Sequence, residues 1–87
     1  MDKKEFRKCL RQIRGEDESG LYKLVKAYFI PAKQAALKRV EDPETADKIA
    51  IKFFIYINAN ADKLKDIENP DEWVFKRIDE MVNDIKR

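Results

Sequence analysis

The sequence predicts an all-α fold, a compact bundle of about four helices. Apolar residues recur at helical spacing, only two glycines occur among 87 residues, and two of the three prolines directly follow good helix-capping residues. The segments predicted to be helical are residues 3–14, 21–40, 43–65 and 70–87. The short connections are typical of a helical bundle, so we expect residues 1–87 to form a single domain.

Two dipeptides mark helix starts, namely Asp42-Pro43 and Asn69-Pro70. Proline at the first helical position gives up an N–H that has no partner there, and Asp or Asn before it can accept from the free N–H groups of the first turn. Glu72 lies three residues after Asn69, where a capping-box acid belongs. Pro31 removes a backbone hydrogen bond inside the second segment, so we expect a kink or break near residues 29–30.

The stretch DKIAIKFFIYINANA, residues 47–61, is rich in residues that favour strands. Its five consecutive apolar residues, 53–57, do not fit a half-buried strand, although a fully buried strand would tolerate them. At 100° per residue, one arc of about 160° holds a wide apolar stripe, which predicts a helix. The members of that stripe are Ile49, Ala50, Phe53, Phe54, Tyr56, Ile57, Ala61 and Leu64.

The opposite face of this predicted helix carries two lysines and two isoleucines, Lys48, Ile51, Lys52 and Ile55. Ile51 and Ile55 cannot enter the same core as Phe53 and Phe54. Either the first helix covers them, or they are an ordinary exposed pair, or a partner protein binds there. We therefore take these four residues as the candidate partner-binding site.

The composition argues against catalysis and against a membrane protein. The chain has no histidine and a single cysteine, Cys9, so it offers no nucleophile with an orienting base, and we expect no enzyme activity, cofactor or metal. The longest uncharged run, residues 53–61, is too short to cross a bilayer, and the charged N-terminus lacks the apolar segment of a signal peptide. We expect a cytoplasmic protein without a membrane partner.

Charge is balanced overall and concentrated locally. Nineteen basic and 17 acidic residues give a weak net field, which makes no general case for nucleic acid. The first 14 residues contain six bases and two acids, with Phe6, Leu10 and Ile13 on one helical face. This helix either packs on the bundle with its bases in solvent, which we favour, or binds a membrane surface or nucleic acid.

Three stretches in this order, IRGEDESGLYKLVKAYF, AALKRVEDPETADKIAIKFFIYI and IENPDEWVFKRIDEMVNDIKR, span nearly the whole chain. Together they resemble region 2 of bacterial RNA polymerase sigma factors, especially the compact extracytoplasmic-function type. The second stretch is similar to the family's D-A-E-D-L-V-Q-E-V-F helix, and the third to its closing helix with a Trp after a short Pro turn. The resemblance implies a fold of the sigma region 2 type.

In that family, the third helix binds the clamp helices of the polymerase largest subunit through acidic and amide side chains. The resemblance places Lys48, Ile51 and Lys52 at the family's Asp, Gln and Glu positions. Two acids have become bases, and like charges opposed across an interface lower affinity. The changed surface suits an acidic partner with an apolar groove, or a second copy of the domain in a homodimer.

The family's fourth helix, with its preceding turn, engages the −10 promoter element. The DNA-binding candidates that the resemblance implies here are Trp73, Lys76, Arg77 and Arg87. Residues 73–87 carry four bases and three acids, a weak phosphate footprint, and Glu80 stands at the family's Asn position. Trp73 either stacks on a base or, as we favour, anchors the core.

Two functions remain open from the sequence. The first is a transcription-initiation module that binds RNA polymerase and contributes to −10 recognition, as part of a longer sigma factor or as a small subunit. The second is a non-catalytic protein interaction module on the same fold, able to self-associate. Family resemblance favours the first, whereas the changed face at Lys48 and Lys52 favours the second.

Overall fold

The computed structural model describes residues 1–85 and confirms the predicted all-α bundle. Its helices are α1 (Lys3–Arg14), α2 (Glu18–Val40), α3 (Pro43–Asn60) and α4 (Pro70–Ile85), and the described residues contain no strand. None of the helices described is long and apolar enough to cross a membrane.

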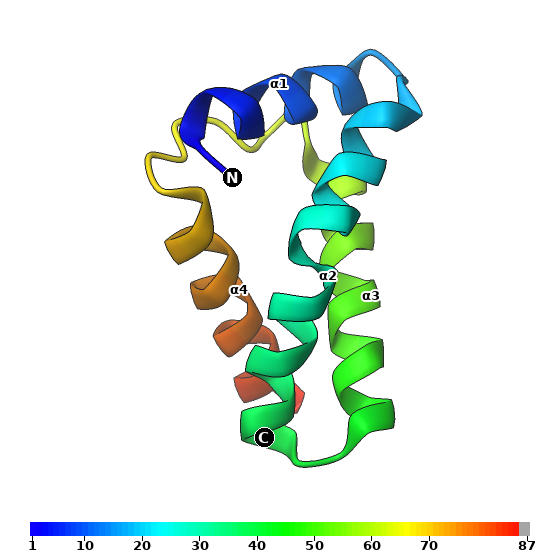
Figure 1. The fold of residues 1–87 in the computed structure, drawn as a ribbon, viewed down its shortest axis with the longest axis vertical. Helices are drawn as coiled ribbons and strands as arrows, with labels where there is room; N and C mark the ends of the chain where they lie inside the picture. The colour runs from blue at the N-terminus through cyan, green and yellow to red at the C-terminus, as the bar shows by residue number, and fades with distance from the viewer. Residues whose placement is uncertain (86–87) are drawn as a thin grey trace.

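Helices α2, α3 and α4 form a three-helix bundle, and α1 lies across one end of it (Figure 1). Figure 1 shows α2 and α3 running side by side, α4 leaning against them, and α1 lying across the end where α2 begins. α2 packs against each of the other three helices, and α3 also packs against α4. In its second half, α2 turns Ala32 and Ala36 toward the core, and these small side chains let neighbouring helices approach closely.

The predicted apolar stripe of α3 is confirmed as the core-facing side. Ile49, Phe53 and Ile57 are fully buried, whereas Tyr56 and Leu64 at the edges of the stripe are only half-buried. Residues 53–57 therefore belong to a helix that is covered on one wide face, as the period of 3.6 residues requires.

Two helix boundaries differ from the predicted ones. α2 starts three residues earlier than predicted, because the Asp17 carboxylate accepts a hydrogen bond from the Ser19 N–H at 3.0 Å and so caps the helix. α3 ends at Asn60, five residues earlier than predicted, and the chain then continues in an irregular segment, residues 61–69. α2 continues through Pro31 as a single helix, so the break considered near residues 29–30 does not occur.

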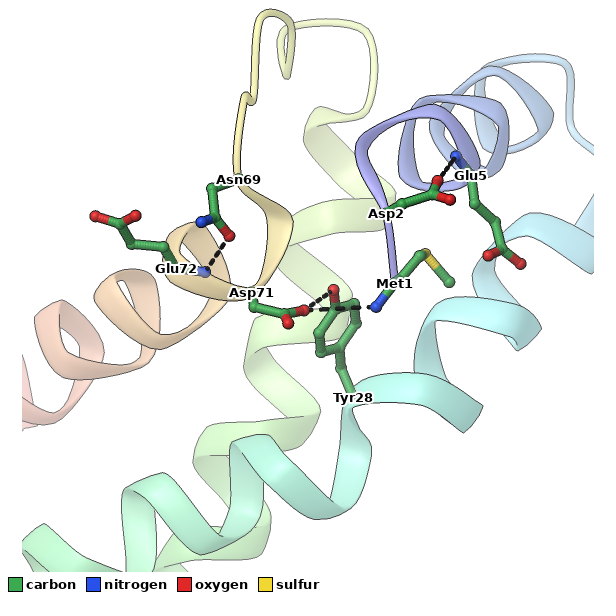
Figure 2. Close-up of polar contacts among 7 residues, drawn as sticks. All are labelled: Met1, Asp2, Glu5, Tyr28, Asn69, Asp71 and Glu72. Carbon is green, nitrogen blue, oxygen red and sulfur yellow. Dashed lines mark hydrogen bonds and ion pairs between the residues drawn. The ribbon is translucent and has the colours of Figure 1, made fainter.

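The two predicted caps behave differently. Asn69 accepts a hydrogen bond from the Glu72 N–H at 3.1 Å, which confirms the predicted cap of α4 (Figure 2). The side-chain cap predicted at Asp42 was wrong, because its carboxylate instead accepts a hydrogen bond from the Thr45 hydroxyl. Pro43 still occupies the first turn of α3, where its missing N–H is harmless.

A small polar network joins the starts of α1 and α4 to the middle of α2 (Figure 2). The buried Tyr28 donates its hydroxyl hydrogen to Asp71 Oδ1 at 2.6 Å, and the Met1 amine lies 3.6 Å from the same oxygen. Burial, reinforced by Asp71, raises the pKa of Tyr28, so its hydroxyl remains a donor throughout the physiological pH range. Asp2 completes this end of the molecule by capping α1 at the Glu5 N–H.

The contact between α1 and α2 depends on the absence of a side chain at Gly20. A Cβ atom at this position would overlap the Cys9 carbonyl oxygen and would lie 2.8 Å from the Gln12 Cβ. We expect Gly20→Ala to lower the free energy of unfolding by about 1–3 kcal/mol, although alanine is the better helix former. Urea denaturation measures this, and a stabilised variant would contradict the close approach.

Candidate protein-docking surface

The outer face of α3 is exposed as its periodicity predicts. Ile51 is 51% exposed and Ile55 is 62% exposed, and both point away from the core that holds Phe53. The first helix does not cover them, because both side chains remain more than half exposed in the folded chain. Of the explanations left open by the sequence, intramolecular cover by α1 is therefore excluded.

The two isoleucines form one wall of an apolar groove between α2 and α3, which we call the docking groove. It has a volume of about 310 Å³. α2 contributes Leu21, Val25 and Phe29, and α3 contributes Ile51, Phe54, Ile55 and the polar Asn58. The rings of Phe29 and Phe54 stack with centroids 6.3 Å apart. This stacking joins the two helices where they line the groove.

The apolar surface extends along α2 beyond the docking groove. Tyr22 is 68% exposed and lies three residues before Val25, on the same side of the helix. Exposed apolar side chains gathered around a groove are the usual mark of a protein-binding site, whereas scattered ones are not. The α2 wall was missed in the sequence, although Leu21, Val25 and Phe29 recur there every four residues.

Charged residues of both signs lie on α2 and α3 near the docking groove. Lys48 lies 3.9 Å from Glu44 one turn away, and both side chains are exposed, so this ion pair contributes little. Lys33 pairs more closely with Asp47, at 2.9 Å. Lys52 forms no ion pair with any residue in the described part of the chain, and its ammonium group remains available to a partner.

Trp73, the aromatic candidate for DNA binding, is half-buried in an aromatic cluster. Its ring centroid lies 6.0 Å from that of Phe6 and 5.8 Å from that of Phe53. The indole therefore joins α4 to α1 and α3, which is the core-anchor role favoured by the sequence.

The basic DNA-binding candidates do not share one surface. Arg77 lies over the ring of Tyr56 at 4.2 Å and bonds to Glu80 at 3.1 Å, so it faces α3 and is already neutralised. Lys76 is exposed on the other flank of α4, in a shallow groove with α2. Arg87 lies outside the described residues.

The groove that contains Lys76 also contains basic residues of α2 and an exposed aromatic ring. Lys38 and Arg39 line it, and Arg39 pairs with Asp79 at 2.8 Å. Phe75 is 42% exposed there. Sequence reasoning did not select Phe75 or Lys38, because only packing brings α2 and α4 together.

Groups that carry chemistry are sparse in the described residues. Cys9 is buried under α2, and this burial raises the pKa of its thiol, which keeps it neutral and unreactive. Within residues 1–85, no three His, Cys, Asp or Glu side chains meet in a way that would hold a metal ion.

Comparison of the chain with family models, with curated proteins and with solved structures finds no significant match. The resemblance to sigma region 2 therefore rests on the order and spacing of its own motifs.

Proposed function

We propose that this chain is a transcription-initiation module of the sigma region 2 type, which docks on the clamp helices of the RNA polymerase largest subunit. The observation that carries the proposal is the docking groove, because it lies on the α3 face that the resemblance assigns to polymerase. Ile51 and Ile55 form its outer wall and are more than half exposed. A groove of this kind accepts the apolar edge of a helix.

Lys48 and Lys52 are compatible with a basic partner if apolar contacts at the centre of the interface supply most of the binding free energy. Their long side chains can then extend to the edge of the interface and remain hydrated. Glu44 lies beside Lys48 and offers one carboxylate to the partner's bases. Binding is then expected to depend strongly on the isoleucines and weakly on the lysines.

Mixing the purified chain with the isolated clamp coiled coil tests this proposal. Size exclusion coupled to light scattering reports both association and mass. A complex of one chain with one coiled coil supports polymerase docking. The proposal is contradicted if no complex forms even when both components are present at concentrations far above the dissociation constants usual for regulatory complexes.

A second candidate, self-association through the same groove, is favoured by one charge on α3 and one just beyond its end. Lys48 and Asp62 each lie seven residues from Ile55. A two-fold axis beside Ile55 would therefore set Lys48 of one copy opposite Asp62 of the other, in the reciprocal manner of a symmetric dimer. The same light-scattering experiment decides this, because a chain that runs at twice its monomer mass without binding the coiled coil supports the dimer.

The proposal also includes promoter contacts by α4, and these predict a salt effect. We expect replacement of Lys76, Arg77 and Arg87 by Ala to weaken binding of a single-stranded −10-like oligonucleotide. The slope of log affinity against log salt should fall by about 0.7 for each phosphate that the variant no longer neutralises. Lys76→Ala alone should account for more of the loss than Arg77→Ala, since Arg77 already pairs with Glu80. Fluorescence anisotropy over a salt series measures this, and an unchanged slope removes the DNA role.

A further inference from the structure

The irregular segment between α3 and α4 runs along α1 in the opposite direction, and contacts at both ends hold it there. At one end, Arg14 Nη1 donates to the Ala61 carbonyl oxygen at 3.0 Å. At the other end, Lys3 pairs with Glu68, two residues before α4 begins. Figure 1 shows this segment, in yellow, passing beside α1.

A cleft of about 320 Å³ lies between α1 and this segment, and its walls are strongly basic. Four cationic side chains line it, namely Arg7, Arg11, Arg14 and Lys65. Asp66 is the one acidic residue among the lining residues within the described chain. This volume is at the lower end of the range of small-ligand sites.

The positive charge in the cleft is largely uncompensated. Arg7 lies 3.9 Å from the exposed Glu68, a weak pairing, and Arg14 bonds to a neutral carbonyl group. Arg11 and Lys65 form no ion pair with any other residue of the 85 described. Arg11 and Arg14 lie in the last turn of α1, where positive charge interacts favourably with the helix dipole. That interaction does not explain why both side chains line the same cleft.

The floor of the cleft is apolar. Leu10 is 3% exposed and Ile67 is 8% exposed, so the cations project from a surface that water solvates poorly. Electrostatic attraction to an anion is stronger at such a surface than in bulk water. The apolar face of α1 is already buried in the bundle, so this helix has no apolar side to insert into a membrane.

We propose that this cleft binds phosphate groups, supplied by a free nucleotide or by a nucleic-acid backbone. Arginine presents a planar set of donors that matches phosphate oxygens, and three arginines spaced four and three residues apart on one helix face can reach the same anion. This proposal is independent of the docking groove, which lies on the α2–α3 face.

Contacts at its two ends fix the segment that forms one wall of the cleft. Between them, Asp66 adopts a left-handed backbone conformation with φ 60°, which bends the segment directly after Lys65. Hydrogen bonding and ion pairing with Lys3 lower the pKa of Glu68. The ion pair between Lys3 and Glu68 is therefore present at neutral pH and is lost as the pH falls through the lowered pKa of Glu68.

Titration of the ¹⁵N-labelled chain with sodium pyrophosphate, ATP and a short single-stranded oligonucleotide tests the proposal. We expect backbone amide shifts confined to residues 7–14 and 64–67. Arg11→Ala should weaken binding at least about tenfold, the effect of losing a charge-assisted hydrogen bond. Lys8→Ala is the matched control, because it removes one charge from an exposed position of α1 outside the cleft, and should change affinity less than about twofold.

The outcomes separate the sources of phosphate and the possible failures. Shifts with pyrophosphate and ATP identify a free nucleotide or phosphate as the ligand. Shifts with the oligonucleotide alone identify a strand backbone, and the effect of Arg11→Ala then distinguishes this cleft from Lys76 on α4. The proposal is overturned if no ligand shifts the cleft amides, or if Lys8→Ala weakens binding as much as Arg11→Ala.

Discussion

Replacement of Ile51 by Glu is expected to abolish partner binding at the docking groove without unfolding the protein. The Ile51 side chain is 51% exposed in the free chain, so a carboxylate there remains hydrated. In a complex the same carboxylate would be buried among the apolar side chains of the docking groove and of the partner, at a high desolvation cost. We expect affinity for the clamp coiled coil, or for a second copy, to fall at least about 30-fold, the effect of losing an interface hot spot.

The free energy of unfolding should change by no more than about 0.5 kcal/mol, as for other exposed positions. Ile55→Glu should behave in the same way. Ile85→Glu is the matched control, since Ile85 is 46% exposed on α4 and lies outside the docking groove. A large loss of stability with Ile51→Glu would mean that this side chain belongs to the core. Equal losses of binding with Ile51→Glu and Ile85→Glu would show that the groove is not the interface.

Phe53→Ala should cause the largest loss of stability among the changes considered. Phe53 is fully buried at the centre of α3, where its ring contacts those of Phe54 and Trp73. Truncation removes the transfer free energy of the ring and leaves a cavity that neighbouring helices cannot close. We expect a loss of about 3–5 kcal/mol in the free energy of unfolding, a large part of the total stability of a small domain.

The fluorescence of Trp73, the one tryptophan of the chain, reports this unfolding directly. Phe75→Ala removes the same ring from α4, where Phe75 is 42% exposed, and should cost less than about 1 kcal/mol. If Phe75→Ala were as destabilising as Phe53→Ala, the α2–α4 groove would be part of the core and not an open surface.

The elements of the fold were predictable because their signals are local. Asn69-Pro70 marks the start of α4, and the hydrogen bond that the Glu72 N–H donates to Asn69 Oδ1 confirms it. The apolar period of residues 47–61 predicted which face of α3 is buried. The two wrong boundaries, at Glu18 and Asn60, concern helix ends, where a single side-chain hydrogen bond or the path of a loop decides the outcome.

The candidate sites were predictable only in part, because each is shared between segments distant in the chain. Periodicity alone showed that Ile51 and Ile55 lie opposite the core, but it did not show that α2 adds the second wall of the docking groove. The contributions of Lys65 to the basic cleft and of Lys38 to the α2–α4 groove were hidden for the same reason.

The order of residues by itself therefore specified four helices, the buried face of α3 and its exposed isoleucine pair, since helical period and capping act over a few residues. Tertiary packing decided the rest. Packing of Phe6, Phe53 and Trp73 in one aromatic cluster sets α1 across the end of the bundle. That placement leaves Ile51 and Ile55 uncovered and brings the arginines of α1 beside residues 61–69, which no local pattern in the sequence encodes.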